Sequence, residues 1–193
     1  MKPPMGAAFG AVLTLTLAFG GLAAAQTATS YAAVTAAGTP QAQFNFRVTL
    51  IPVPGRVQQV TASLKLDPLR PQNVTGTVQV PLKTLMTGIK LRDEHARNYL
   101  KAGQFPLATF RVGKLSGITA LPVGQEVSGR VSGEFTLAGV TRPLSAPVTL
   151  RREASGRITV ATQFDSPLWE YGVQIRGADK NTDVRLMFAV TAK

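Results

Sequence analysis

The strongest constraint on the fold is a strict alternation of apolar and polar residues along residues 126–150. Every second residue from Val127 to Leu137 is apolar or glycine, and the residues between them are polar or charged. The same period of two returns from Leu144 to Leu150, after a Gly- and Pro-containing segment at 138–143 that suits a chain reversal. A period of two places the apolar side chains on one face of a strand. These residues therefore predict a long antiparallel hairpin with one apolar face.

Similar alternation elsewhere indicates that the chain is all-β. The further predicted strands are residues 43–53, 57–66, 73–80, 107–113, 157–164 and 184–190, with turns at 52–55 and 67–71. With the hairpin they make about eight antiparallel strands. An up-and-down barrel is the economical closure of such strands, because it leaves no exposed sheet edge.

One helix interrupts this pattern. Residues 92–102 are good helix formers, with Asp93 and Glu94 early, Lys101 late and Gly103 as a stop. Residues 81–88 read as a single helical turn, opened by proline and ended by glycine. The predicted fold is an eight-stranded barrel with one short helix inserted between its early and middle strands.

The N-terminus has the features of a secretory signal peptide. Lys2 precedes an apolar run at residues 7–22, and Ala23, Ala24 and Ala25 provide the small residues that a signal peptidase needs. The run is shorter than the roughly 20 residues that span a bilayer, which argues against a retained anchor. We expect residues 1–25 to be removed, residues 26–39 to form a leader, and residues 40–193 to form one barrel domain. The expected location is the periplasm or another extracytoplasmic compartment.

Composition limits the partners of the mature chain. The 193 residues contain no cysteine, so an exported fold must rest on its core and not on disulfides. The net charge of +11 favours anionic partners, and a transient contact with an anionic membrane surface is one such contact. Nucleic acid is a poor candidate, because the aromatic residues fall on apolar strand faces and the helix carries both signs of charge. The oligomeric state stays open, a homodimer included.

The sequence lacks the usual signs of an enzyme. His95 is its one histidine, and it contains no G-x-S-x-G motif, phosphate loop or dinucleotide fingerprint. The close acidic pairs lie among Arg and Lys, which favours solvated ion pairs over catalytic carboxylates. We therefore predict no catalytic residue, no metal site and no cofactor other than a bound lipid.

The inner face of the barrel is either packed solid or hollow around a ligand. An eight-stranded barrel can have either kind of interior. Small inward residues, such as Gly129, Gly133 and Ala146, favour a hollow interior that a long apolar ligand would fill. Alternatively, the small residues relieve crowding in a twisted, solid barrel.

Three passages carry a resemblance to a known family. The first, residues 81–110 (PLKTLMTG…LRDEHARNYLKAGQFPLATF), is similar to the T-G…RD-x-H…YP…F segment of the YceI-like family. The second, residues 133–150 (GEFTLAGVTRPLSAPVTL), resembles the family's G-x-L-T-L-x-G-V-T-x-P-V signature. The third, residues 165–173 (DSPLWEYGV), resembles its region with a Phe-Gly pair. Members of this family are exported bacterial proteins, and their lipocalin-like barrel holds a polyisoprenoid or a related lipid. The resemblance implies the same barrel here, with one isoprenoid-type tail along its axis.

The resemblance and the alternation together indicate which residues contact such a ligand. The expected lining residues are Phe46, Val48, Leu64, Val78, Phe110, Val131, Phe135, Val148, Val160 and Phe188, with Leu85, Met86, Phe105, Trp169 and Tyr171 near the mouth. By motif, Arg92, His95 and Arg176 are the expected contacts of an anionic head group. Two functions stay open: a lipid-binding protein for carriage, storage or stress protection in the envelope, and a solid-cored, non-catalytic interaction or stress module at an anionic surface.

Overall fold

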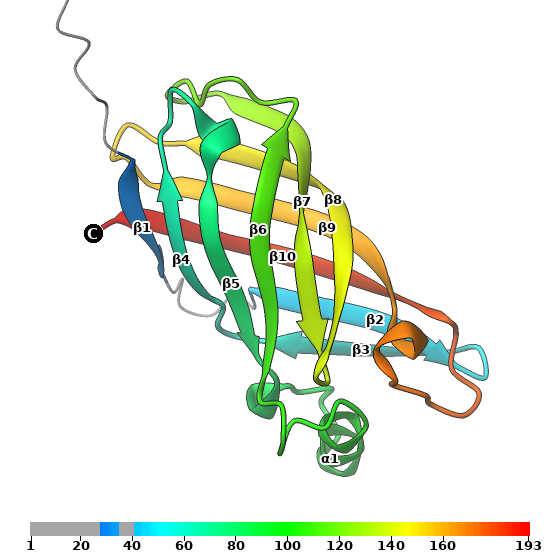
Figure 1. The fold of residues 1–193 in the computed structure, drawn as a ribbon. Helices are drawn as coiled ribbons and strands as arrows, with labels where there is room; N and C mark the ends of the chain where they lie inside the picture. Colours follow the sequence, from blue (N-terminus) through cyan, green and yellow to red (C-terminus); the bar gives the residue numbers. More distant parts are fainter. Residues whose placement is uncertain (1–27, 35–40) are drawn as a thin grey trace, which may run out of the picture.

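The structure is a computed structural model that describes residues 28–34 and 41–193 (Figure 1). The expected signal peptide, residues 1–25, lies outside the described residues. The expected leader is described at residues 28–34, and most of that segment forms a strand. Tyr31 in this strand is buried, so the barrel wall begins earlier than the sequence predicted.

Ten strands and one α-helix make up the described chain. The strands are β1 (Thr29–Val34), β2 (Ala42–Val48), β3 (Ile51–Val57), β4 (Thr61–Leu66), β5 (Thr75–Pro81), β6 (Leu107–Ser116), β7 (Glu126–Leu137), β8 (Val140–Arg152), β9 (Ile158–Pro167) and β10 (Asn181–Ala192). The helix α1 spans Lys90–Tyr99, and 3₁₀ turns occur at η1 (Pro71–Asn73), η2 (Leu82–Thr84) and η3 (Leu168–Tyr171).

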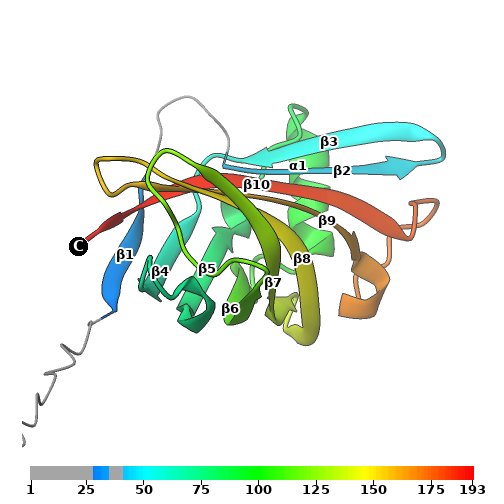
Figure 2. The same cartoon turned by 90° about the horizontal axis from the view of Figure 1, so that it is seen from above.

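A single antiparallel sheet runs in the order β1-β4-β5-β6-β7-β8-β9-β10-β2-β3 and closes where β1 pairs with β10. One edge of β10 is divided between two partners: residues 183–186 pair with β2, and residues 189–192 pair with β1. The result is a closed eight-stranded barrel with the β2–β3 hairpin attached, and α1 lies beneath that hairpin (Figure 2). The predicted lipocalin-like barrel is confirmed, with two more strands than expected.

The β7–β8 hairpin forms as its alternation predicted, but its turn is shorter. Val127 pairs with Leu150 and Leu137 with Val140, so only Ala138 and Gly139 lie in the turn. Both have positive φ, 50° and 84°, which is the geometry that two-residue hairpins favour. The residues after Gly139, proline included, already belong to β8.

The predicted turn at residues 52–55 was wrong. The chain reverses at Thr49 and Leu50, and residues 52–55 lie inside β3. Pro52 and Pro54 are tolerated in a strand there because β3 ends the sheet order, where a missing backbone N–H removes no ladder bond. The two prolines were therefore interpreted as a turn, whereas they mark an edge strand.

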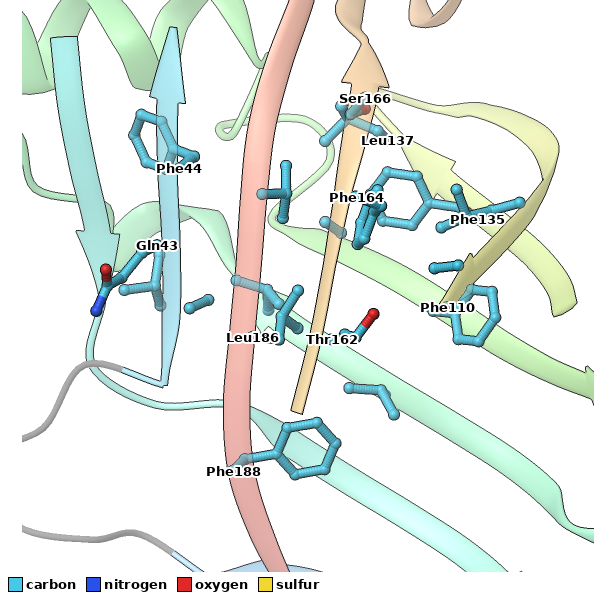
Figure 3. Close-up of a pocket in the computed structure, with 18 of the residues that line it drawn as sticks. Gln43, Phe44, Phe110, Phe135, Leu137, Thr162, Phe164, Ser166, Leu186 and Phe188 are labelled. Atoms are coloured by element: carbon cyan, nitrogen blue, oxygen red, sulfur yellow. The ribbon is translucent and has the colours of Figure 1, made fainter. Parts of the chain in front are cut away.

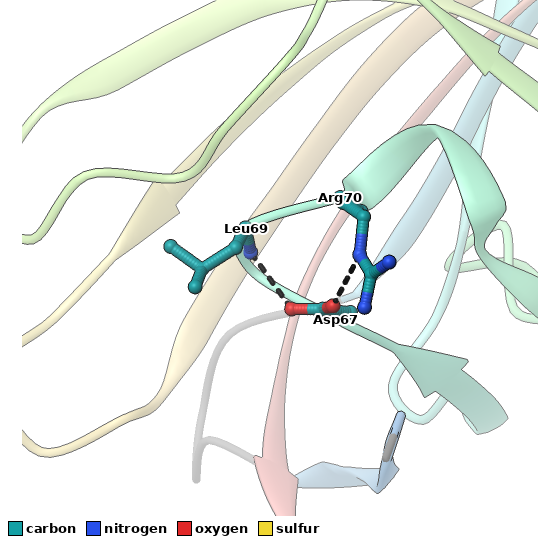
Figure 4. A network of polar contacts seen from close by, with 3 residues as sticks. All are labelled: Asp67, Leu69 and Arg70. Carbon is teal, nitrogen blue, oxygen red and sulfur yellow. Dashed lines mark hydrogen bonds and ion pairs between the residues drawn. The ribbon is translucent and has the colours of Figure 1, made fainter. Parts of the chain in front are cut away.

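The end of the barrel near η1 is closed by buried side chains and a fixed turn. Ile118 and Leu121, between β6 and β7, are buried there, and the Leu121 N–H donates to the Pro68 carbonyl (2.7 Å). Next to Pro68, the Asp67 carboxylate accepts from the Leu69 N–H (2.9 Å) and from Arg70 Nε (3.1 Å) (Figure 4). The bond from the Leu69 N–H, followed by the contact with Arg70, holds the pKa of Asp67 below its ordinary value.

The inward glycines of β7 have a different role from the one expected. A β-bulge at Gly113 shifts the register of β6 against β7, and it brings the β6 backbone close to Gly133. A Cβ on Gly133 would lie 2.0 Å from the Arg111 carbonyl oxygen, and one on Gly129 would lie 2.4 Å from the Ser116 carbonyl oxygen. These glycines therefore permit close backbone approach, and neither lines the cavity described below.

Gly133→Ala should accordingly destabilise the barrel by about 1–3 kcal/mol, because backbone and not a mobile side chain occupies the space of the new methyl group. Urea unfolding would measure this. Gly103→Ala is the matched control, since no atom of the described residues lies within 4 Å of its added Cβ. Equal midpoints for the two variants would contradict this explanation of Gly133.

Candidate functional site: an apolar cavity

The barrel encloses an apolar cavity of about 230 Å³ (Figure 3). Strands β2 to β10 and helix α1 contribute to its wall. Almost every lining side chain is aliphatic or phenylalanine, and the exceptions are Gln43, Tyr99, Thr162, Ser166 and Thr182. Among the described residues, the wall contains no Asp, Glu, Lys, Arg or His. The cavity is thus suited to a neutral, mostly hydrocarbon ligand.

Ten of the expected ligand-contacting residues lie on this wall: Phe46, Leu64, Val78, Leu85, Phe110, Val131, Phe135, Val148, Val160 and Phe188. The period of two explains this outcome, because closing the barrel turns one face of every strand inward. The structure therefore brings together, from eight strands and the segment before α1, side chains that are far apart in sequence. Their contact with a ligand stays a prediction.

Three of the other expected positions pack elsewhere. Val48 is half-buried at the end of β2, where it bridges to Ala178. The Met86 backbone exchanges two hydrogen bonds with Arg56 of β3 (2.8 and 3.0 Å). The Phe105 ring lies where a Cβ on Gly139 would be, and so covers the β7–β8 turn.

The η3 turn accounts for the remaining two positions. Trp169 is 54% exposed, outside the cavity. Tyr171 is buried, and its ring meets Phe135 edge-on at 5.4 Å between centroids. Burial, and then the nearby Glu170 carboxylate, raises the pKa of Tyr171. Tyr171 therefore supports the wall from behind Phe135.

The cavity reaches the surface between β2 and α1. Gln43 on β2 and Tyr99 on α1 both line it, and both are exposed to solvent. Ala96 and Leu100 of the same helical segment also line it, so α1 forms one side of the opening. The Arg56–Met86 backbone bridge ties β3 to the segment before this helix.

A polar clasp fixes the start of α1 at this opening. The Asp93 carboxylate accepts from the backbone N–H (2.6 Å) and the hydroxyl (2.5 Å) of Thr87, and Arg92 donates to the Thr87 hydroxyl (2.9 Å) and carbonyl (2.7 Å). Arg97 donates to the Leu85 carbonyl (2.9 Å). The hydrogen bonds from the Thr87 hydroxyl and then its N–H lower the pKa of Asp93. The T-G…RD motif thus has a structural role.

The three residues expected to contact an anionic head group lie apart from the cavity. Arg92 is engaged with Thr87, His95 is exposed on α1, and Arg176 is exposed in the segment between η3 and β10. None of the three lines the cavity. The structure therefore does not bring them together as an anion site.

Sequence reasoning also missed part of the wall. Phe164, Val184 and Leu186 line the cavity and continue the alternation of strands already recognised, so their period could have identified them. Ser166 and Thr182 line it as well, but as polar residues they gave no such signal. No cluster of metal-ligating side chains occurs among the described residues, and no helix in that part of the chain is long and apolar enough to cross a membrane.

The fold and the cavity define a lipocalin-like barrel of the ligand-enclosing type. The family model of the YceI-like domain matches residues 31–192, and the chain belongs to this family. The match begins at Tyr31, inside β1, in agreement with the early start of the barrel. A search of curated proteins gives no match.

Solved structures share the fold at low sequence identity. A polyisoprenoid-binding domain from Saccharophagus degradans, implicated in plant cell wall breakdown, is 16% identical with a TM-score of 0.69, over 86% of this chain and 99% of that one. BcnA from Burkholderia cenocepacia is 16% identical with a TM-score of 0.65, and the match covers 78% of this chain and 95% of BcnA. The YCEI protein of Campylobacter jejuni is 17% identical with a TM-score of 0.54, and the match covers 71% of this chain and 84% of that protein.

The Asp93 clasp should make stability depend on acid pH. The pKa of Asp93 is lowered in the folded state, so its contribution is present above the unfolded pKa near 3.8 and is lost as the pH falls through the folded value. Asp93→Asn should lower Tm at pH 7, and the difference from wild type should shrink below about pH 4. Thermal unfolding monitored by circular dichroism between pH 7 and pH 2 measures this difference.

Asp67 titrates in the same direction and remains in both proteins, so the difference between them isolates Asp93. A Tm difference that stays constant down to pH 2 would show that the clasp does not need the charge.

Proposed function

We propose that this protein is an exported, non-catalytic lipid-binding protein that holds a long apolar ligand of the polyisoprenoid type inside its barrel. The observation that carries the proposal is the apolar cavity of about 230 Å³. Membership of the YceI-like family and the likeness to a polyisoprenoid-binding domain support it. Carriage, storage or stress protection in the envelope are the roles that such binding would serve.

The energetics of the cavity favour a ligand over an empty interior. One water needs roughly 10–15 Å³ of such space, so the cavity is many times larger, yet its wall offers water few partners. An unfilled apolar cavity of this size costs on the order of several kcal/mol, a large share of the stability of a typical domain. Each CH₂ group of a bound lipid would contribute roughly 0.8 kcal/mol by leaving water. The solid-core alternative does not account for this volume.

Export rests on the N-terminal sequence. Cleavage after Ala25 would leave Gln26 as the first residue, shortly before β1 begins at Thr29. We propose a periplasmic or other extracytoplasmic location on that basis.

Filling the cavity should abolish binding. Val131 lies half-buried on the wall, and Val131→Trp would place an indole in the space of the ligand tail. We expect at least a tenfold weaker affinity for geranylgeraniol, measured by native mass spectrometry. Organic extract of the wild-type protein should also contain a long-chain lipid that the variant lacks.

Met187→Trp is the control, because Met187 is 57% exposed on β10 and does not line the cavity. A wild-type protein that carries no lipid and does not bind geranylgeraniol would overturn the proposed function.

The proposal includes a contact with an anionic membrane surface through the tip of the β2–β3 hairpin. Leu50 and Ile51 at this tip are 83% and 66% exposed. Leu50 has a φ of 69°, a conformation that suits glycine far better than leucine. A large apolar side chain kept at a strained, exposed position is consistent with insertion into a lipid surface.

The charges around the tip match such a surface. The Thr49 N–H donates to the Gly177 carbonyl (2.8 Å), and the Asp179 N–H donates to the Arg47 carbonyl (2.9 Å). This pairing places the residues 176–180, with Arg176 and Lys180, beside Arg47 on the hairpin. Three basic side chains against one acidic one favour anionic head groups.

Leu50→Gly separates the membrane role from folding. The glycine suits the turn, so Tm should stay equal or rise, while binding to vesicles with 30% phosphatidylglycerol should fall about fivefold or more in a sedimentation assay. Leu69→Gly is the control, since Leu69 is similarly exposed (57%) but lies in the turn near η1. Unchanged vesicle binding by Leu50→Gly would exclude the tip as the membrane contact.

A further inference from the structure

Two hydroxyl groups on the cavity wall have no hydrogen-bond partner among the described residues. Ser166 on β9 and Thr182 on β10 are each 3% exposed, and both line the cavity. Neither Ser166 Oγ nor Thr182 Oγ1 is bonded within the described structure. The two residues are direct cross-strand partners, so both side chains project from the same place on the inner face.

Such a pair is unusual, because buried polar groups are almost always satisfied. Thr162 also lines the cavity, two inward positions before Ser166 on the same strand (Figure 3). Its hydroxyl shows the ordinary arrangement, because it donates to the Pro147 carbonyl (2.7 Å). A buried hydroxyl without a hydrogen-bond partner destabilises the folded protein, whereas an alanine or valine side chain in its place would not. The cost is recovered if a bound molecule supplies the missing partner.

The surroundings define what that partner is. No charged side chain lines the cavity within the described residues, so a phosphate or carboxylate at this depth would have no counter-ion. A neutral oxygen needs none. Two adjacent hydroxyls can donate to a carbonyl oxygen, and they can both donate to and accept from an alcohol.

We propose that Ser166 and Thr182 form a subsite for a neutral, oxygen-bearing head group, an alcohol or a carbonyl, on the tail of the bound lipid. This inference rests on the proposed function and specifies its ligand. It replaces the anion site that the sequence suggested at Arg92, His95 and Arg176.

The position of the pair suits a head group with its tail directed into the barrel. From Ser166, the inward residues of β9 run back through Phe164, Thr162 and Val160 to Ile158, about 27 Å of strand. Ile158 lies in the main buried cluster with Leu121, at the closed end. Leu168 and Ile175, on the other side of Ser166, line the cavity where the chain leaves the barrel wall for η3.

A set of probes with one tail and different ends tests the subsite. Geranylgeraniol, geranylgeranial, the corresponding hydrocarbon with a terminal methyl group and geranylgeranyl phosphate would be compared by native mass spectrometry with the full mature protein. We expect the alcohol, the aldehyde or both to bind about tenfold more tightly than the hydrocarbon and the phosphate. The variant Ser166→Ala/Thr182→Val should bind the neutral probes with equal affinity to the hydrocarbon.

The stability of the ligand-free variant provides an independent readout. Since the two hydroxyls have no partner in the part of the chain that the structure describes, Ser166→Ala/Thr182→Val should leave Tm unchanged or raise it, whereas a structural role would lower it. Ser128→Ala/Thr149→Val is the matched control: this is also a cross-strand Ser–Thr pair, but it is exposed and its hydroxyls bond to each other (3.1 Å). The control should keep the wild-type preference among the probes.

The outcomes distinguish this inference from the function on which it rests. If the wild-type protein binds none of the four probes, the proposed function fails. If it binds all the neutral probes equally, or binds the phosphate most tightly, the barrel is a lipid-binding protein and the Ser166–Thr182 subsite is wrong.

Discussion

Strand β10 holds the structure together, because it pairs with three other strands. One edge of β10 pairs with β9 over ten residues. Its opposite edge pairs with β2 at residues 183–186 and with β1 at residues 189–192. The pairing with β1 closes the eight-stranded barrel, and the pairing with β2 carries a hairpin outside it. Without this division the sheet would stay open at β1, and the apolar face would have no enclosed interior. The same strand, β10, therefore both closes the barrel and carries the attached hairpin.

The cavity follows from closure combined with the choice of inward side chains. Eight strands leave an interior that side chains can fill, and here they do so at one end, where Leu121, Ile158 and Val190 are almost completely buried. Towards α1, Phe46 and Phe135 line the cavity and remain half-buried, although other aromatic rings pack against both of them. The hollow end is thus also the end where the wall becomes irregular and solvent enters.

Sequence alone predicted the barrel and ten residues of its inner wall, because the period of two survives in the long strands. It could not predict what depends on contacts between distant segments. Gly133 was interpreted as empty space, but the β6 backbone beside a bulge occupies that space. Pro52 was interpreted as a turn, but it lies in an edge strand. Arg92 was interpreted as a ligand contact, but Thr87, five residues earlier, binds it.

These corrections separate two kinds of residue around the opening. The charged and polar residues of the recognisable motif, such as Arg92 and Asp93, bond to backbone and side-chain atoms of Thr87 and so determine where α1 lies. The residues that meet the interior are uncharged, and Ser166 is one of them. A motif of this kind can therefore specify the same opening in barrels that hold different ligands. The selectivity for a ligand then depends on a few inward positions of β9 and β10, where one hydroxyl in an otherwise apolar wall has a large effect on binding.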